Sequence, residues 1–322
     1  MFDVVVVGAG IVGLTCAARL QAAGARVAVL TAGEPSATVS WIAAAVWYPT
    51  RTTGDPRVLG WARRSFDEFA EQAARGVPGV VMRPTRMLLR AETPVPWWAE
   101  GLRDFRAAPP PAGYVGEWRH PAPSVEMARY LPWLIEQVTA AGGAVLRRLV
   151  ARLADVAQLA PVIVNATGLA AGKLADDPAV HPVRGQIVLV DNPGLVVSVR
   201  DEENPAGPTY IHPRSRDVVL GGTFEPMETD VVPDAATGQA IIERCAALVP
   251  ELTGAPVRAQ LVGLRPARHG GARVAVDPDG LPGGVRLIHD YGHGGAGMTL
   301  SWGCADEVAA LAAEPGPGAS RS

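Results

Sequence analysis

A glycine-rich turn directly after the first apolar run restricts the fold of this chain more than any other feature. Four consecutive valines follow Asp3, and the next segment, Gly8–Gly13, reads GAGIVG, a G-x-G-x-x-G spacing. A helical pattern then runs from Ile11 to about Ala23, and a second strand pattern spans 26–30. Strand, glycine turn, helix and strand in this order predict a βαβ unit that binds a dinucleotide.

Each glycine of the turn has its own physical role. Gly8 allows the tight turn after the strand, Gly10 lets a pyrophosphate approach the backbone, and Gly13 lets the helix pack closely on the sheet. The positive N-terminal end of the helix then faces the phosphates. We therefore expect the phosphates of the ligand at this turn.

The end of the second strand departs from the usual pattern. An Asp or Glu is expected there to hold the ribose hydroxyls, but Thr31 occupies the position and Glu34 follows three residues later. Segment 31–38 contains no Lys or Arg, which argues against a 2′-phosphate and hence against NADP.

The other nucleotide-binding elements are spread along the chain. Three adjacent alanines, Ala43–Ala45, would permit close approach of a flat ligand, although a plain apolar helix fits this segment equally well. A buried strand with a polar turn is predicted at 161–168, and another strand at 184–189. Segment 209–226 predicts a hairpin with its turn at 214–217. We interpret the intervening material as a second, sheet-based domain inserted twice into the first.

Composition excludes several classes of function. The chain has 322 residues, enough for two domains, and its formal net charge of −3 gives no reason to expect nucleic acid as a partner. No apolar run reaches the roughly 18 residues that span a bilayer, and no signal-peptide pattern is present, so we expect a cytoplasmic protein without a membrane partner. Cys16, Cys245 and Cys304 form no metal-binding pattern, and a bridge between Cys245 and Cys304 stays open.

Seven blocks together make the chain resemble the D-amino acid oxidases, which are FAD-dependent flavoenzymes. In chain order the blocks are VVVVGAGIVGL, AAAVWYP, VNATG, RGQI, YIHP, GLRPAR and HDYGHGGAGMTLSWG, and they cover nearly the whole chain. The resemblance implies an α/β fold with a Rossmann-like FAD-binding domain and an interleaved α+β substrate domain on an antiparallel or mixed sheet. We assign 1–51, 136–186 and 277–313 to the FAD-binding domain, 52–135 and 187–276 to the substrate domain, and 314–322 to a disordered tail.

The resemblance also implies which residues contact FAD. The glycine turn would hold the pyrophosphate, the segment from Val39 would follow the cofactor, and the turn after 164 would flank the adenine. Near the end of the chain, a helix from about Gly297 would direct its N-terminus at the N1–C2=O edge of the flavin and stabilise the negative charge of the reduced ring. The full implied set is Gly8, Ala9, Gly10, Ile11, Val12, Gly13, Val39, Ser40, Ala44, Ala45, Val46, Val164, Thr167, Gly168, Arg265, Gly292, Gly294, Gly295, Gly297, Met298 and Thr299.

Three residues are implied for the D-amino acid itself. Arg265 would bind the carboxylate with its planar guanidinium, Tyr210 would donate a second hydrogen bond, and the carbonyl of Gly295 would accept from the amine. Arg268 is the weaker candidate for the carboxylate, and His293 is given a positional role without acid–base work. The resemblance implies that a hydride would pass from Cα to flavin N5 and that the imino acid formed would be hydrolysed by water to a 2-oxo acid and ammonia. O2 would then reoxidise the flavin and give hydrogen peroxide.

Substrate preference follows from charged residues before Tyr210. Arg200 could bind a second carboxylate, but three acidic residues follow it at 201–203, which favours neutral or basic D-amino acids. D-aspartate oxidase and glycine- or sarcosine-type oxidases are the alternatives. Ala206 stands where mammalian-type members carry a lid tyrosine, so we expect the short connection of the yeast members and no mobile lid that limits product release.

Two rival classes stay open at this point. One is an NAD-dependent dehydrogenase, which would be colourless when purified. The other is a protein that holds FAD without turnover, which would be yellow but would not react with amino acids. The partners that we expect are the D-amino acid and O2, with a homodimer as the assembly to test and no metal ion.

Overall fold

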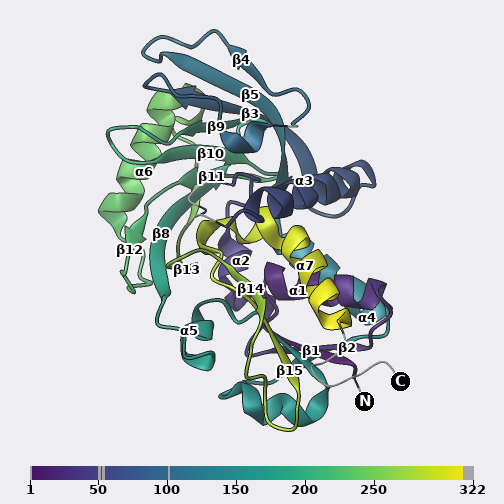
Figure 1. Ribbon diagram of the computed structural model, residues 1–322. Coiled ribbons are helices and arrows are strands. Elements are labelled where there is room, and N and C mark those ends of the chain that lie inside the picture. The colour runs from purple at the N-terminus through teal and green to yellow at the C-terminus, as the bar shows by residue number, and fades with distance from the viewer. Residues whose placement is uncertain (1, 50–51, 53–54, 101, 315–322) are drawn as a thin grey trace.

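Two β-sheets organise the chain in the computed structural model, which describes residues 2–49, 52, 55–100 and 102–314 (Figure 1). The first sheet has six strands in the order β14-β15-β7-β1-β2-β6. All its neighbouring strands are parallel except β14, which pairs antiparallel with β15. The bounds are β1 Val4–Val7, β2 Val27–Thr31, β6 Ala144–Arg147, β7 Val162–Asn165, β14 Arg273–Val276 and β15 Arg286–Tyr291.

The six-stranded sheet is buried on both faces, which explains its unbroken apolar strands. Val4 and Val6 belong to the large core that contains the helices α1 (Ile11–Ala22), α4 (Met127–Ala140) and α7 (Gly297–Ala313). Val5 and Val7 point to the other face, where they pack with the 3₁₀ helix η3 (Leu153–Leu159). Parallel pairing of β1 with β2 across α1 confirms the βαβ unit predicted from the N-terminal sequence.

The second sheet has nine strands, and most of its pairs are antiparallel. Its order is β12-β8-β11-β10-β9-β3-β5-β4, and β13 also pairs with β8. The bounds are β3 Val80–Leu89, β4 Arg106–Ala108, β5 Gly116–Val125, β8 Val180–Asp191, β9 Ser198–Asp201, β10 Thr209–Pro213, β11 Asp217–Gly221, β12 Glu225–Pro226 and β13 Val257–Arg268. The predicted hairpin is the antiparallel pair β10–β11, with its turn at 214–216. Helix α6 (Ala235–Leu248) packs against β8, β10 and β11.

Sheet membership moves three of the boundaries that we assigned from the sequence. Helix α4 begins at Met127 and packs on α1, so the chain returns to the first sheet before residue 136. Strand β8 begins at Val180 and belongs to the nine-stranded sheet, so that part begins before residue 187. Strand β14 begins at Arg273 and belongs to the six-stranded sheet, ahead of the boundary at 277. These boundaries depend on strand pairing between residues far apart in the sequence, which local sequence patterns do not predict.

Short elements and one long helix connect the two sheets. Helix α3 (Val58–Ala74) contacts α7 on one side and β3 and β5 on the other. Helix α2 covers only Val39–Ile42, so the segment with three alanines is not the plain apolar helix that we considered. The remaining short helices are η1 Pro35–Ala37, η2 Trp97–Ala99, η4 Gly168–Ala170, α5 Ala171–Leu174, η5 Pro250–Leu252 and η6 Gly294–Ala296.

Two predictions concern the ends of the chain and its relation to membranes. The tail predicted at 314–322 lies outside the described residues from 315 onward. Across the described ranges, no helix combines the length and the apolar character that crossing a membrane requires.

Candidate active site

The glycine turn brings three backbone segments into contact at the start of α1. A Cβ atom on Gly13 would overlap the carbonyl oxygen of Gly8, and one on Gly8 would overlap the carbonyl oxygen of Ala166 after β7. Gly8 also has φ +115°, which disfavours residues with a side chain. Helix α1 begins without a side-chain cap and without an acidic residue in its first turn. Its positive end is therefore suited to a pyrophosphate, and the backbone around it leaves no space for side chains.

The segment from Val39 to Val46 lies beside this turn. The backbone N–H of Ile11 donates to Ser40 Oγ over 3.0 Å, and a Cβ on Gly10 would lie 3.1 Å from the same oxygen. After α2 the chain leaves the helical conformation, Ala45 has a left-handed backbone with φ 49°, and Val46 is bridged to Ser124 of β5. Ser40, Ala44, Ala45 and Val46 thus follow a path from the start of α1 toward the nine-stranded sheet, and their contact with FAD stays a prediction.

The residues implied for the adenine end lie after β7. Val164 is buried in the core, and the Thr167 hydroxyl donates to Asn165 Oδ1 over 2.7 Å. Gly168 has φ +59°, and a Cβ at this position would lie 3.7 Å from Pro266 Cγ on β13. At the strand end without an acidic residue, the Thr31 hydroxyl donates to the Gly33 carbonyl over 2.7 Å. Glu34 is exposed and pairs with Arg147 of the neighbouring strand β6 over 3.5 Å.

The N-terminus of α7 lies against the N-terminus of α1. A Cβ on Gly297 would lie 3.9 Å from Ile11 Cγ2, and the helix begins without a side-chain cap or an acidic residue in its first turn. The Thr299 hydroxyl accepts from the backbone N–H of Tyr48 over 3.2 Å, which ties α7 to the segment after Val46. The two helix ends together offer positive potential along one line, which fits a cofactor with a pyrophosphate and an electron-accepting ring.

Arg265 lies on β13 and has no carboxylate partner among the described residues. It is half-buried, and its two hydrogen bonds both use Nη1, which donates to the carbonyls of Arg184 and Thr223 over 3.2 Å each. A Cβ on Gly185 would overlap the guanidinium, so the glycine of the RGQI block makes the space that Arg265 occupies. The remaining donors of this arginine are available for a planar anion.

Tyr210 lies next to Arg265, although 55 residues separate them in the sequence. Burial raises the pKa of the Tyr210 phenol, and the charges of Arg265 and Arg200 oppose this only in part. The phenol therefore stays protonated and can donate a hydrogen bond. Cβ atoms on Gly221 and Gly222 would collide with the Tyr210 ring, so these two glycines of β11 and the next turn make room for it.

Gly295 completes this group of three. It lies in η6, directly before α7, and its Cβ position would be 3.6 Å from Arg265 Cδ. Gly292 and Gly294 have φ +84° and +56°, so the turn itself requires glycine at these two positions. The three residues implied for the substrate, Tyr210, Arg265 and Gly295, thus come from three different elements and meet beside the start of α7.

Three other basic residues near this group are paired with carboxylates, whereas Arg244 donates to the carbonyls of Pro208 and Gly222. Arg268 Nε donates to Asp177 Oδ2 over 2.8 Å, which agrees with its lower rank as a carboxylate ligand. Arg184 is buried and pairs with Glu225 over 2.6 Å. Arg200 pairs with Glu202 over 3.2 Å and lies over the Tyr48 ring at 4.4 Å. Of the acidic residues after Arg200, Asp201 instead pairs with Arg90, so only Glu202 neutralises Arg200.

Sequence reasoning missed the glycines that shape the site and the tyrosine beside Arg200. In the sequence, Gly185, Gly221 and Gly222 are glycines within or next to strand patterns. Such a glycine indicates that another group lies close to the backbone, but the sequence does not identify that group. Tyr48 was part of the AAAVWYP block, but no local pattern connects it with Arg200 across 152 residues.

Comparisons with known proteins identify the family of this chain. Residues 3–311 match the family described as FAD dependent oxidoreductase. D-amino-acid oxidase from Rubrobacter xylanophilus is 47% identical over 312 residues, covering 96% of this chain and 95% of the relative. D-amino-acid oxidase from Streptomyces coelicolor is 44% identical over 314 residues, covering 96% of each chain. Human D-aspartate oxidase is 33% identical over 333 residues, covering 97% of this chain and 94% of the relative. Glycine oxidase from Bacillus cereus has the same fold, with a TM-score of 0.78, 19% identity, and coverage of 97% of this chain and 95% of the other.

Proposed function

This chain belongs to the family of FAD dependent oxidoreductases, and from that membership we propose that it oxidises neutral or basic D-amino acids. The products are 2-oxo acids, ammonia and hydrogen peroxide, with O2 as the electron acceptor. Relatives named D-amino-acid oxidase at 47% and 44% identity over nearly the whole chain support this proposal. Two uncapped helix N-termini and a glycine turn without room for side chains fit FAD as the cofactor.

The observation that carries the proposal is a half-buried arginine without an ion-pair partner in the described part of the chain. The Arg265 guanidinium is held by two carbonyl groups and faces no carboxylate, whereas Arg184, Arg200 and Arg268 each have one. A substrate carboxylate would supply the missing anion with two parallel hydrogen bonds. Tyr210 would donate a third bond to the same group, because its raised pKa keeps the phenol protonated.

The remaining contacts would orient the substrate. The Gly295 carbonyl would accept from the amine, so carboxylate and amine would be fixed on one side of the Cα atom. When bound, FAD supplies the acceptor for the hydride and passes the electrons to O2. The chain itself would contribute orientation and a fixed positive potential from α7, and it needs no general base at the Cα hydrogen. With these groups fixed, the L-isomer would exchange the positions of side chain and hydrogen.

D-aspartate oxidation is the second candidate, and one observation favours it. Arg200 lies 5.9 Å from the centre of the Tyr210 ring, so a second cation lies near the position proposed for the substrate carboxylate. Its charge is compensated by Glu202, however, and the ion pair would have to open before Arg200 could bind a side-chain carboxylate. We therefore expect the protein to prefer neutral and basic D-amino acids over D-aspartate.

The decisive experiment mixes purified holoenzyme anaerobically with D- and L-amino acids and follows the flavin absorbance. We expect rapid bleaching by neutral or basic D-isomers and none by L-isomers. Arg265→Met should slow the bleaching on the order of a thousandfold, because a charged hydrogen-bonded pair is lost. Arg258→Met, on the same strand but paired with Asp191 at the surface, is the matched control and should react normally. No bleaching by any amino acid would contradict the proposal, and bleaching by D-aspartate alone would establish the second candidate.

Assembly and compartment complete the proposal. We expect a homodimer, and the exposed apolar side chains of Met227, Val231 and Val232 in one segment are the candidate contact surface. Light scattering on the holoenzyme tests this, with Val232→Glu as the disrupting variant. We also expect the protein to work in the cytoplasm, because its three cysteines are all free thiols, and cell fractionation tests this.

A further inference from the structure

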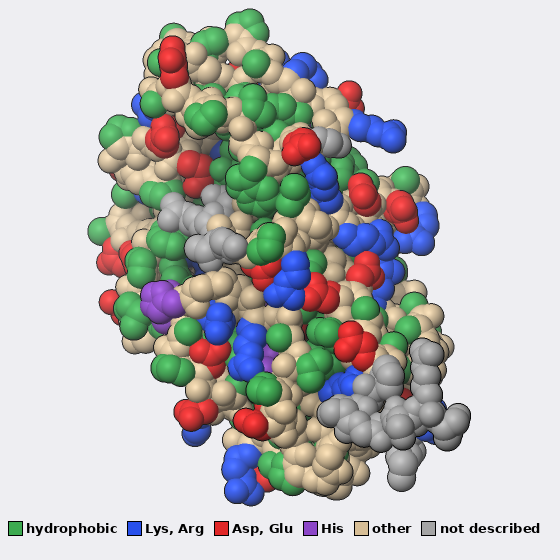
Figure 2. Space-filling view, viewed as in Figure 1, with side chains coloured by type: hydrophobic (Ala, Val, Ile, Leu, Met, Phe, Trp, Pro, Cys, Tyr) green, Lys and Arg blue, Asp and Glu red, His purple; other side chains and the backbone are tan. Residues whose placement is uncertain are grey.

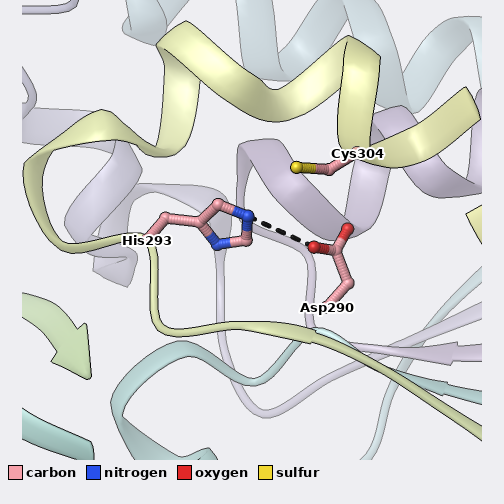
Figure 3. Close-up of side chains that lie close together, drawn as sticks. All are labelled: Asp290, His293 and Cys304. Carbon is pink, nitrogen blue, oxygen red and sulfur yellow. Dashed lines mark ion pairs between the residues drawn. The ribbon is translucent and has the colours of Figure 1, made fainter. Parts of the chain in front are cut away.

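A cluster of buried polar side chains lies between β15, α1 and α7 and has no part in the proposed chemistry. Asp290 is the fifth residue of β15, His293 lies just after this strand, and Cys304 lies on α7 (Figure 3). One ligand atom from each of these three residues lies within 4.8 Å of the other two. In Figure 3 the three side chains point toward a common space between the strand end and the helix.

Two atoms in this cluster lack the hydrogen bonds that buried polar atoms normally make. Asp290 Oδ1 and His293 Nε2 are 3.2 Å apart, but their angles are not those of a hydrogen bond, and neither atom has another hydrogen-bond partner in the described structure. Asp290 is fully buried and forms no ion pair with a described Lys or Arg. A buried carboxylate and an imidazole nitrogen aimed at the same space, both without hydrogen bonds, are unfavourable, and a cation between them would satisfy both.

We propose that Asp290 Oδ1, His293 Nε2 and Cys304 Sγ bind one divalent transition-metal ion, with zinc as the best match. Carboxylate oxygen, imidazole nitrogen and thiolate sulfur are the three ligand types of protein zinc sites, at about 2.0–2.3 Å from the ion. Two ligand atoms at that distance from a tetrahedral ion lie roughly 3.3 Å apart, close to the separation of Oδ1 and Nε2. The sulfur selects against magnesium and calcium, which prefer oxygen ligands.

The surroundings of the cluster favour a metal ion in two further ways. Cys16 Sγ, on α1, lies 3.0 Å from the other oxygen of the same carboxylate, Asp290 Oδ2, and donates a hydrogen bond to it. Such a second contact orients a metal-binding carboxylate, so Cys16 supports the site without being a ligand. A carboxylate, a thiolate and a neutral imidazole carry two negative charges, so a divalent ion would leave the buried cluster neutral.

The ion would brace the turn that carries the substrate-binding carbonyl. His293 is bridged to Ala267 of β13, and Gly294 and Gly295 follow it directly. Binding would connect this turn to α7 through Cys304 and, through Asp290 and Cys16, to α1. The role is structural, since none of the three ligands is among the residues proposed to contact the substrate.

The test loads untagged, reduced holoenzyme with Zn2+ or Co2+, removes loose metal by gel filtration, and measures bound metal by mass spectrometry. We expect one ion per chain. Cobalt should also give intense d–d absorption in the red, where oxidised flavin does not absorb, as tetrahedral sites with a thiolate ligand do. Holoenzyme without stoichiometric metal and without cobalt bands would overturn the proposal, and the cluster would then be a metal-free ion pair.

Variants separate this site from adventitious binding. Cys304→Ala should weaken zinc binding on the order of a hundredfold or more, and Cys16→Ala about tenfold, because the first removes a ligand and the second only its support. Cys245→Ala removes the third buried thiol, in the other sheet's core, and should leave stoichiometry and cobalt spectrum unchanged. Undiminished metal binding by Cys304→Ala would place the ion elsewhere and refute the site. If Cys304→Ala does not fold, the cobalt spectrum of the unmodified holoenzyme decides alone.

Discussion

Glycine serves opposite purposes in the two halves of this molecule. Around the six-stranded sheet, Gly8 and Gly13 are needed because backbone meets backbone, at the carbonyl groups of Ala166 and Gly8. In the nine-stranded sheet, Gly185 and Gly221 are needed because functional side chains occupy the space above them, the guanidinium of Arg265 and the ring of Tyr210. In the first half small residues let main-chain segments come close together where we propose that FAD binds, and in the second they make room for the side chains that we propose recognise the substrate.

The distribution of charged side chains on the surface does not separate the two halves. Charged residues are spread over both, and the visible face shows blue and red side chains interspersed along its whole length (Figure 2). The recognition groups therefore do not stand out by surface charge. Arg265 is held by two carbonyl groups, whereas Arg184, Arg200 and Arg268 each have a carboxylate partner among the described residues.

Gly13→Ala should have the largest effect if the glycines of the first half serve backbone packing. The new methyl group would overlap the Gly8 carbonyl inside a packed interior, and such overpacking costs about 3 kcal/mol. We expect loss of bound FAD and of folded protein together, measured by the flavin-to-protein absorbance ratio and by thermal unfolding. Gly60→Ala, at an exposed helical position with open space, is the control and should be neutral or slightly stabilising. Full FAD content in Gly13→Ala would break the comparison.

Gly185→Ala should damage activity and spare the cofactor, in contrast to the first variant. The methyl group would displace the Arg265 guanidinium, and we expect kcat/KM for a D-amino acid to fall on the order of a hundredfold. The measurement is steady-state oxygen consumption with FAD content determined on the same sample. Loss of FAD in proportion to activity would show that this glycine serves cofactor packing as well.

Low pH should destabilise the nine-stranded sheet more than the six-stranded sheet. Burial lowers the pKa of His120 on β5 to about 4 and that of His212 on β10 well below its usual range. Since both titrate near 6.5 once unfolded, the unfolded chain gains protons that the folded chain cannot, and stability falls as pH drops from about 6.5 toward 4. His120 alone should account for about 2 kcal/mol between about pH 6.5 and pH 5.

His120→Gln tests this through the pH dependence of the unfolding temperature. The variant should be less sensitive to acid than the unmodified protein, because its unfolded chain no longer gains this proton. In the six-stranded sheet, burial also lowers the pKa of His289, but the hydrogen bond with Asp277 opposes the shift. If His120→Gln and the unmodified protein lost stability equally in acid, His120 would not be responsible for the acid sensitivity of the second half.

Glu202→Gln should have the smallest effect, and it concerns substrate preference alone. Without the carboxylate, the Arg200 charge beside Tyr48 is no longer compensated, and D-aspartate should gain about fivefold in kcat/KM relative to D-alanine. Glu203→Gln, an exposed neighbour, is the matched control. An unchanged ratio of the two substrates would mean that Arg200 does not reach the substrate side chain.

Local patterns predicted the elements of the first half well and the shape of the second half poorly. The strand, glycine turn and helix at the N-terminus follow from residues within one another's immediate neighbourhood, so β1, α1 and the start of α7 at Gly297 agree with the sequence. The pairing of β13 with β8 and the position of β14 depend on contacts across tens of residues. The hydrogen bond from Cys16 to Asp290 spans 274 residues, so no local pattern indicates it.

Strand β13 has a consequence for how the molecule can move. Along its length it pairs with β8, and at its far end Ala267 is bridged to His293, while the Arg268 side chain packs under Gly292. Arg265, the proposed carboxylate ligand, and the turn that enters α7 are thus joined by a single hydrogen-bonded strand. A hinge-like opening of the two halves would have to break the bridge between Ala267 and His293.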